Sequence, residues 1–409
     1  MGLILIKPFF EAAWIRVFYD VILMFRSKIQ ISLILKGTRK KMSKLFESST
    51  INNMKLSNRF VRSATWEGMS TNEGAVTPKL IETMTALARG GVGLIITSHA
   101  YVRQEGQAAP WQLGIYKDEL IEGLQKMTTA VHECGSKIIL QLAHAGNFAV
   151  EHLIGRPPLV VSDFNGLAES PRKEITPQDI REIVIAFADA ARRAKSAGFD
   201  GIQIHSGHGY LLSQFLSPAF NRRQDNYGGS VGNRARIHLE VNDAIRKAIG
   251  NNYPVLIKMN CRDFTENGLD IEDSLQVGSL LSKAGIDAIE LSGGLITGGK
   301  LSPSRPGINS ENKEAYFMED ARSFKRQIDI PLILVGGIRS FEVAERLLED
   351  GVADYISMSR PFIKEPGLVN RWKAGDHRKA ECISDNLCFR PGIKGEGIYC
   401  VVEKREKTE

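Results

Sequence analysis

Three side chains that can activate a carbonyl compound lie close together in this sequence, at His205, His208 and Tyr210. They follow the apolar run 201–204, which is typical of a short buried strand. Imidazole N–H groups can polarise a carbonyl oxygen, and a phenol with an unperturbed pKa of about 10 keeps its proton at neutral pH. We therefore predict that these three residues are catalytic, and that they polarise a carbonyl compound and donate a proton to it.

The His-x-x-His spacing of the same turn is also compatible with half of a metal site. The turn itself contains no carboxylate or cysteine that could serve as a third ligand. We therefore predict no metal here, and a purely structural role for the two histidines is the remaining alternative.

Eight short apolar runs alternate with longer helical patterns, as expected for parallel strands that are buried on both faces. The clearest helical pattern, 177–197, opens with a capping box at Thr176 and Asp179 and has Pro177 at its first position. Eight such units predict an α/β fold, a (β/α)8 TIM barrel over residues 42–370, and the count argues against a doubly wound sheet. The predicted strands are 60–63, 92–97, 137–142, 201–204, 255–259, 288–291, 332–335 and 355–358.

In such a barrel the catalytic groups stand at the C-terminal ends of the strands. Gly336 and Gly337 follow the seventh predicted strand, and Ser359 and Arg360 follow the eighth. Glycines let backbone N–H groups approach a phosphate closely, and a guanidinium fork adds further donors. The sequence therefore predicts a phosphate site built from these four residues.

The segment 198–236, which contains the His–Tyr turn, resembles the signature of the old yellow enzyme family of FMN-dependent reductases. The resemblance extends from residue 42 to about residue 370. Within the family, the chain resembles the single-domain form. In this family the turn after the first strand lies against the flavin, which implies contacts from Ser63, Ala64, Thr65 and Trp66. Relatives usually have a small residue at the position of Trp66, so an aromatic plug at the top of the barrel is the alternative for that side chain.

The same resemblance implies flavin contacts from three other strand ends. Ser98 is expected beside the flavin, and its neighbour His99 is expected either there or in a structural role. Gln141 is expected on the flavin pyrimidine, because an amide offers both a donor and an acceptor. Lys258 is expected beside the anionic end of the reduced flavin, and a lysine inside an apolar strand needs a partner. His144 is interpreted as a structural histidine that braces its loop.

The tail, residues 371–409, contains Cys382, Cys388 and Cys400 with a spacing similar to that of multidomain relatives. Those relatives hold a [4Fe–4S] cluster with four cysteines, whereas Asp385 stands here in place of the second one. Four thiolates are the usual requirement, so a cluster is not expected and a vestigial site with reduced cysteines is. No Gly-x-Gly-x-x-Gly follows a strand, so the sequence predicts no separate nicotinamide domain, and the chain is expected to end without one.

The resemblance implies an oxidoreductase of the ene-reductase type. NADH or NADPH would reduce FMN, which would then reduce the activated C=C bond of an α,β-unsaturated carbonyl or enoate compound. Two alternatives stay open: a flavin-dependent amine or C–N dehydrogenase, and a flavin-free sugar-phosphate enzyme. The physiological substrate and the choice between NADH and NADPH do not follow from the sequence.

The composition bounds the possible partners and location. Residues 1–41 carry eight of the 53 basic and two of the 47 acidic residues, so the rest of the chain has 45 of each and no basic bias toward nucleic acid. Five cysteines in a chain of this length do not form a disulfide framework, which favours a location in the reducing cytoplasm.

Residues 1–41 are expected to be an extension, either upstream of a misassigned start codon or a membrane-surface segment, with no transmembrane span. The resemblance is also compatible with a homo-oligomer.

Overall fold

The computed structural model describes residue 24 and residues 43–167 and 170–407 of the 409-residue chain. By its internal contacts the chain divides into two units, Met1–Ser43 and Lys44–Glu409. The extension predicted for residues 1–41 lies, apart from Met24, outside the described residues. Among the described residues no helix is both long enough and apolar enough to cross a membrane.

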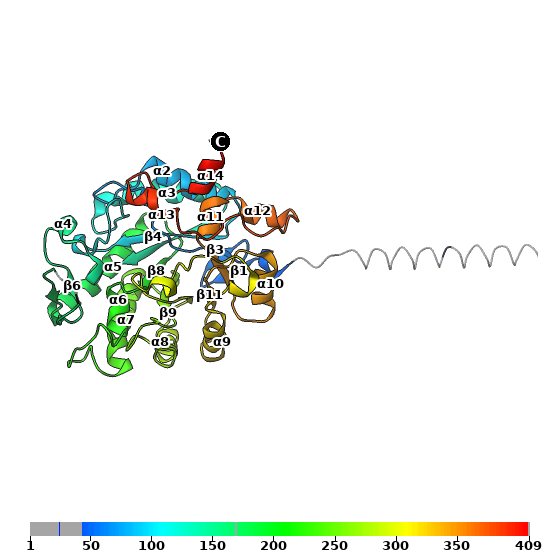
Figure 1. The fold of residues 1–409 in the computed structure, drawn as a ribbon. Helices are drawn as coiled ribbons and strands as arrows, with labels where there is room; N and C mark the ends of the chain where they lie inside the picture. Colours follow the sequence, from blue (N-terminus) through cyan, green and yellow to red (C-terminus); the bar gives the residue numbers. More distant parts are fainter. Residues whose placement is uncertain (1–23, 25–42, 168–169, 408–409) are drawn as a thin grey trace, which may run out of the picture. The chain divides into compact units, whose positions relative to one another are not determined.

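Eight parallel strands close into a barrel, which confirms the predicted (β/α)8 fold (Figure 1). Around the barrel they stand in chain order, and β12 pairs with β3 to close it, with Ile356 opposite Phe60. Each barrel strand overlaps one of the eight predicted apolar runs. They are β3 (Phe60–Arg62), β4 (Leu94–Tyr101), β5 (Lys137–Ala143), β8 (Ile202–Ser206), β9 (Val255–Asn260), β10 (Ala288–Ser292), β11 (Leu332–Leu334) and β12 (Tyr355–Met358).

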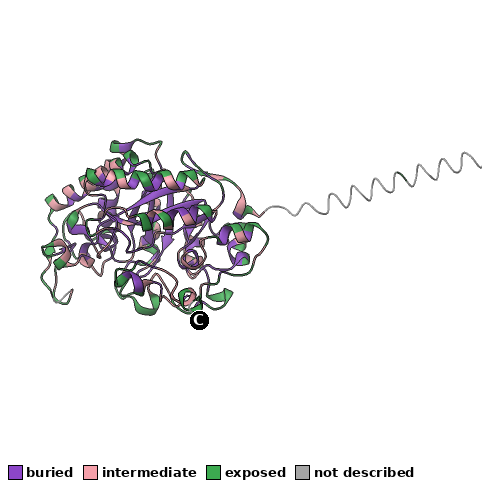
Figure 2. Cartoon of the chain, turned by 90° about the horizontal axis from the view of Figure 1, so that it is seen from above, coloured by how far each residue is buried: buried purple, intermediate pink, exposed green. Residues whose placement is uncertain are grey.

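Amphipathic helices surround the barrel and bury their apolar faces on it (Figures 1 and 2). Helix α5 (Pro177–Ser196) begins with the predicted capping box, in which Thr176 and Asp179 satisfy each other's backbone N–H groups. Its buried face includes Ile183 and Phe187. The other helices that follow barrel strands are α2 (Pro78–Arg89), α3 (Ile121–Glu133), α7 (Val231–Ile249), α8 (Ile271–Lys283), α9 (Met318–Gln327), α10 (Phe341–Glu349) and α11 (Arg360–Lys364).

Shorter elements precede the barrel, lie in its loops and form the tail. A hairpin of β1 (Ser49–Ile51) and β2 (Met54–Leu56) packs Ile51, Met54 and Leu56 into the same apolar cluster as the barrel interior. The remaining short elements are α4 (Glu151–Ile154), β6 (Leu159–Val160), β7 (Lys173–Glu174), α6 (Leu211–Leu216), α12 (Leu368–Lys373), α13 (Phe389–Ile393) and α14 (Val401–Glu406). The predicted boundary at residue 370 falls inside α12, and residues Lys44–Glu409 form one compact unit that includes the tail.

Candidate active site

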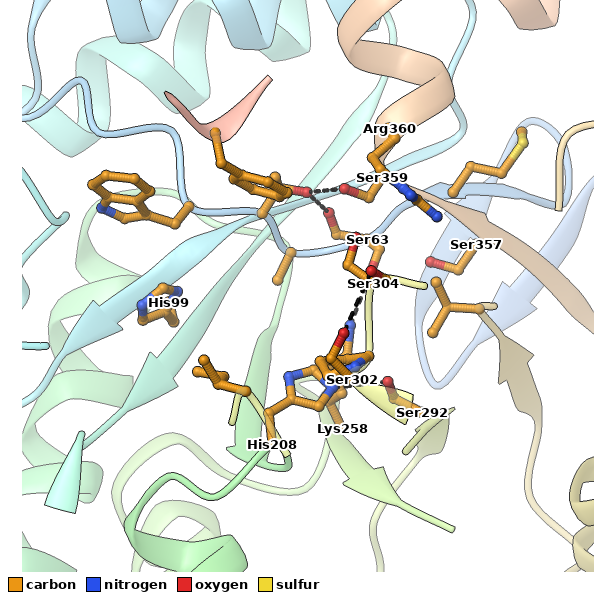
Figure 3. Close-up of a pocket in the computed structure, with 18 of the residues that line it drawn as sticks. Ser63, His99, His208, Lys258, Ser292, Ser302, Ser304, Ser357, Ser359 and Arg360 are labelled. Atoms are coloured by element: carbon orange, nitrogen blue, oxygen red, sulfur yellow. Dashed lines mark hydrogen bonds between the residues drawn. The ribbon is translucent and has the colours of Figure 1, made fainter. Parts of the chain in front are cut away.

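A cavity of about 570 Å³ lies among the C-terminal ends of the barrel strands and the loops that follow them (Figure 3). Of the fourteen residues predicted for the site, twelve line this cavity. They are Ser63, Ala64, Thr65, Trp66, Gln141, His205, His208, Tyr210, Lys258, Gly337, Ser359 and Arg360. The barrel therefore brings together side chains that are up to 297 positions apart in the sequence, as between Ser63 and Arg360.

The other two predicted site residues, Ser98 and Gly336, do not line the cavity. Strand β4 continues to Tyr101 and its register shifts between Ile96 and His99, so that His99 reaches the cavity and Ser98 is buried behind it. The carbonyl of Gly336 accepts a hydrogen bond from the Tyr316 backbone N–H, whereas Gly337 lines the cavity.

The two predicted catalytic histidines lie side by side in the cavity wall. Their ring centroids are 5.4 Å apart, and the Tyr210 ring lies 4.7 Å from that of His205. His205 belongs to β8, whereas His208 stands in the following turn with φ +63° and its backbone N–H donates to Asn260 Oδ1 at 3.1 Å. Burial, with added repulsion from Lys258 and His99, holds both histidine pKa values well below their usual range. Both rings are therefore neutral at pH 7.

Ser292, at the end of β10, is the hydrogen-bond partner that can set the tautomer of His208. Its hydroxyl lies 2.8 Å from His208 Nε2 and can donate to that nitrogen. A neutral ring that accepts at Nε2 carries its proton on Nδ1, which can then donate to a ligand. The sequence analysis assigned no role to Ser292, although a serine at a barrel strand end was a signal that could have identified it.

Tyr210 precedes α6, and its hydroxyl lies 3.0 Å from Nε2 of His99. Burial raises the pKa of Tyr210 above its usual value. Burial and then Lys258 lower the pKa of His99 to about 4. The proton between these groups therefore stays on Tyr210 at neutral pH. Of the two roles left open for His99, the geometry supports a place in the cavity wall where it orients Tyr210.

Lys258 has the partner that its apolar strand requires. Its Nζ lies 2.7 Å from Ser63 Oγ and 3.2 Å from Oε1 of Glu290. A dashed line marks the first contact in Figure 3. Glu290 lies in β10 and is fully buried. The sequence analysis missed this glutamate, although a carboxylate within the apolar run 288–291 was a signal that it has a polar partner inside the barrel.

The predicted phosphate residues Gly337, Ser359 and Arg360 line the same cavity. Ser359 Oγ lies 2.7 Å from Thr65 Oγ1, and a Cβ on Gly337 would approach Tyr316 Cε1 to 2.7 Å, so only glycine fits there. Arg360 donates to Asn386 of the tail at 2.7 Å. The tail residues Ser384, Asn386 and Phe389 also line the cavity, which the sequence analysis did not predict.

Two further predictions concern residues around this cavity. The Gly146 backbone N–H donates to His144 Nδ1 at 3.1 Å, so His144 braces its loop as predicted. Trp66 lines the cavity and also packs against the tail, where a Cβ on Gly392 would meet its ring at 2.9 Å. The Trp66 side chain therefore lines the cavity and also forms part of the contact between the barrel and the tail.

The tail cysteines Cys382, Cys388 and Cys400 are free thiols and line a second, small cavity together with Asp385. Burial raises the pKa values of Cys382 and Cys388 above their ordinary range. Within the described ranges no group of three or more His, Cys, Asp or Glu residues is arranged to hold a metal ion.

Comparison with known proteins identifies the family. The model of the NADH:flavin oxidoreductase / NADH oxidase family matches residues 44–379. This chain belongs to that family. An NADH oxidase of Thermoanaerobacter brockii is 36% identical over 84% of this chain and 53% of its own length, so the chain spans about half of that relative. An NADPH dehydrogenase of Bacillus subtilis strain 168 is 37% identical over 79% of the chain and 92% of the relative.

Solved structures agree with the resemblance to old yellow enzyme. An old yellow enzyme homologue from Zymomonas mobilis is 26% identical, with a TM-score of 0.69 over 82% of this chain and 94% of that one. A 2-naphthoyl-CoA reductase has a TM-score of 0.81 at 27% identity, over 88% and 56% of the two chains. Histamine dehydrogenase from Rhizobium sp. 4-9 has a TM-score of 0.79 at 26% identity, over 87% and 52%.

The family uses FMN with NADH or NADPH, as predicted, and this excludes the flavin-free alternative. The cavity fits such a cofactor. Among its lining residues, Gln141 and Lys258 offer polar groups, and Gly337, Ser359 and Arg360 offer groups able to donate to a phosphate. Two buried nitrogens, Trp66 Nε1 and His205 Nδ1, also have no hydrogen-bond partner among the described residues, which is expected of a site whose ligand supplies the partner.

Proposed function

We propose that this protein is an ene-reductase, which uses NADH or NADPH and FMN to reduce the activated C=C bond of an α,β-unsaturated carbonyl or enoate compound. The observation that carries the proposal is the juxtaposition of neutral His205 and His208 with protonated Tyr210 in one cavity wall. The relatives named as NADPH dehydrogenase and old yellow enzyme homologue support it.

Bound FMN supplies hydride transfer from the nicotinamide to the substrate. His205 and His208 donate hydrogen bonds to the carbonyl oxygen of the substrate, where negative charge grows during reduction. In other enzymes the loss of one such donor costs about 2.7–4 kcal/mol of transition-state stabilisation. Tyr210 donates the proton that completes the product, and its hydroxyl is held by His99 until the substrate binds.

We further propose that the barrel and the tail act as one catalytic unit in the cytoplasm. Asn386 and Phe389 of the tail line the same cavity as the catalytic residues, which supports a single unit. The five free cysteines are consistent with a reducing compartment.

A second candidate function is oxidation of an amine or C–N bond, which the likeness to histamine dehydrogenase favours. In that case electrons would leave through a cluster in the tail, but Asp385 stands where a fourth cysteine is required. Iron and acid-labile sulfide content of the purified protein separates the two functions. Stoichiometric iron and sulfide together with amine-dependent reduction of the flavin would favour the second.

The test of the proposed function is an anaerobic titration of the purified protein. We expect flavin absorbance bands that bleach when NADH or NADPH is added and return when cyclohexenone follows. A protein that is colourless and takes up no added FMN would contradict the proposal. A flavin that bleaches but is not reoxidised by cyclohexenone or other enones and enoates would leave the cofactor in place and reject the substrate class.

A further inference from the structure

A network of buried polar side chains lies beneath the cavity floor, and Glu290 is at its centre. Glu290 is fully buried and does not itself line the cavity. Its Oε1 accepts hydrogen bonds from Ser63 Oγ at 2.6 Å and Ser357 Oγ at 2.9 Å, and it pairs with Lys258 Nζ at 3.2 Å. Its Oε2 accepts from Gln203 Nε2 at 2.9 Å. The carboxylate thus contacts one side chain from each of the strands β8, β9 and β12, and a fourth, that of Ser63, directly after β3.

Glu290 is ionised in this network. Burial by itself would raise the pKa of its carboxyl, but the charge of Lys258 and the hydrogen bonds from Ser63, Gln203 and Ser357 outweigh burial and lower it. An ionised carboxylate can only accept hydrogen bonds. Every neighbour must therefore turn a donor toward it.

This requirement fixes the direction of an amide chain that ends in the cavity. Because Gln203 gives its NH₂ group to Glu290, its carbonyl oxygen faces Gln141 and accepts from Gln141 Nε2 at 2.6 Å. Gln141 lines the cavity, and one of its two N–H groups donates this hydrogen bond. It is left with its carbonyl oxygen and its second N–H for a ligand, which form the acceptor–donor pair that a flavin pyrimidine edge requires.

The same carboxylate also orients Lys258. A lysine ammonium has three N–H donors, and Ser63 and Glu290 occupy two of them. Since Lys258 lines the cavity, the third N–H is left for a ligand. The negative charge of Glu290 also offsets part of the positive charge that Lys258 presents there.

We propose that Glu290 is a positioning residue for FMN, which fixes the hydrogen-bonding pattern of Gln141 and lowers the flavin reduction potential by pairing with Lys258. The inference rests on the proposed function, in that FMN binds in this cavity. Glu290 acts through two neighbours and does not touch the cofactor itself.

Glu290→Gln tests both effects, because it keeps the size of the side chain and removes its charge. The new amide would place its NH₂ against that of Gln203 and force both glutamines to turn, so that Gln141 no longer offers its oxygen. We expect the dissociation constant of FMN, measured by fluorescence with the apoprotein, to rise at least tenfold. With FMN saturating, we expect the midpoint potential to rise by about 30 mV or more, which is a tenfold change for a two-electron couple.

A charge-swapped double variant, Glu290→Gln with Gln203→Glu, separates the two effects. An anion at position 203 again accepts from Gln141 Nε2 and from the new amide at 290, so the direction of the chain is restored. We expect FMN affinity to return to within about threefold of wild type, whereas the potential stays raised because the charge is now farther from Lys258. Failure of the swap to recover affinity, with the thermal melt unchanged, would reject the orientation effect.

Glu105→Gln is the matched control, because Glu105 is also a buried ion-paired glutamate, but its partners Arg103 and Arg156 do not line the cavity as Lys258 does. If Glu290→Gln and Glu105→Gln give the same FMN affinity and potential, the inference is wrong. If Glu290→Gln does not fold, Gln203→Met tests the inference in its place. We expect Gln203→Met to weaken FMN binding and to leave the midpoint potential of the flavin unchanged. A Gln203→Met variant that binds FMN with wild-type affinity would overturn the inference. Wild-type apoprotein that binds no FMN would instead reject the proposed function.

Discussion

At the scale of single residues, burial decides which groups of this site are charged. His205 and His208 are ordinary imidazoles in sequence, but burial and the nearby charge of Lys258 keep them neutral. The same burial keeps the proton on Tyr210. The site therefore presents neutral donors to a substrate oxygen and a protonated phenol beside them, a combination suited to carbonyl activation at pH 7.

Replacing Tyr210 by Phe tests the proton donor at this scale. We expect FMN binding and flavin reduction by NADPH or NADH to be retained, because the hydroxyl bonds only His99 among the described residues. Reoxidation by cyclohexenone should slow by about 100-fold or more, within the usual contribution of a general acid. Stopped-flow measurement of the two half-reactions separates these steps.

Tyr253→Phe is the matched control for that variant. Tyr253 is a tyrosine whose hydroxyl donates to the Phe199 carbonyl at 2.7 Å, outside the cavity lining. Its loss should leave both half-reactions unchanged. An unchanged rate of enone reduction in Tyr210→Phe would remove Tyr210 from the mechanism.

At the scale of elements, the site depends on how the tail is tied to two barrel loops. Asn386, with φ +61°, accepts from Arg360 Nη1 at 2.7 Å and donates to the Ser304 carbonyl at 2.7 Å. Arg360 begins α11 after the last barrel strand, and Ser304 lies in the loop after β10. One tail side chain therefore links the proposed phosphate arginine to the loop that follows β10.

Asn386→Ala should consequently weaken FMN binding by about tenfold, because Arg360 loses the acceptor that orients its guanidinium. The measurement is the FMN dissociation constant by fluorescence. Asn267→Ala is the control, since Asn267 also has a positive φ of 53° but is exposed and outside the cavity lining. Equal affinity in the two variants would show that the tail does not position Arg360.

At the scale of the whole molecule, the fold lowers the pKa of five of the eight histidines in the chain, of which three are buried and two, His99 and His208, are half-buried. Burial lowers the pKa of His99 and of His144 to about 4 and that of His238 to about 3, from a usual value of 6.5. Below pH 6.5 the unfolded chain therefore binds protons that the folded chain does not.

The stability of the protein should accordingly fall as the pH is lowered through this window. The contribution of these histidines is fully present above pH 6.5 and is lost progressively toward pH 4. Urea unfolding at pH 7, 6 and 5 measures the free energy of unfolding, which we expect to decrease at each step. His144→Asn should reduce the slope, whereas the same change at exposed His152 should not. A stability that is constant from pH 7 to pH 5 would contradict the prediction.

The sequence by itself determined the barrel and most of its site. Eight apolar runs predict eight strands, because strands buried on both faces must be apolar throughout, and the residues after each run must then gather at one end. Twelve predicted residues, among them Tyr210 and Lys258, meet in the cavity for that reason.

Only the tertiary structure decided which side chains complete that site. The register shift in β4 turns His99 rather than Ser98 to the cavity. The pattern of apolar residues along the strand does not predict such a shift. Glu290, Ser292 and Asn386 acquire their roles from partners at least 26 positions away in the chain, such as Ser63, His208 and Arg360. Hydrogen bonds of this kind depend on distances across the closed barrel, and periodicity along one strand carries no information about them.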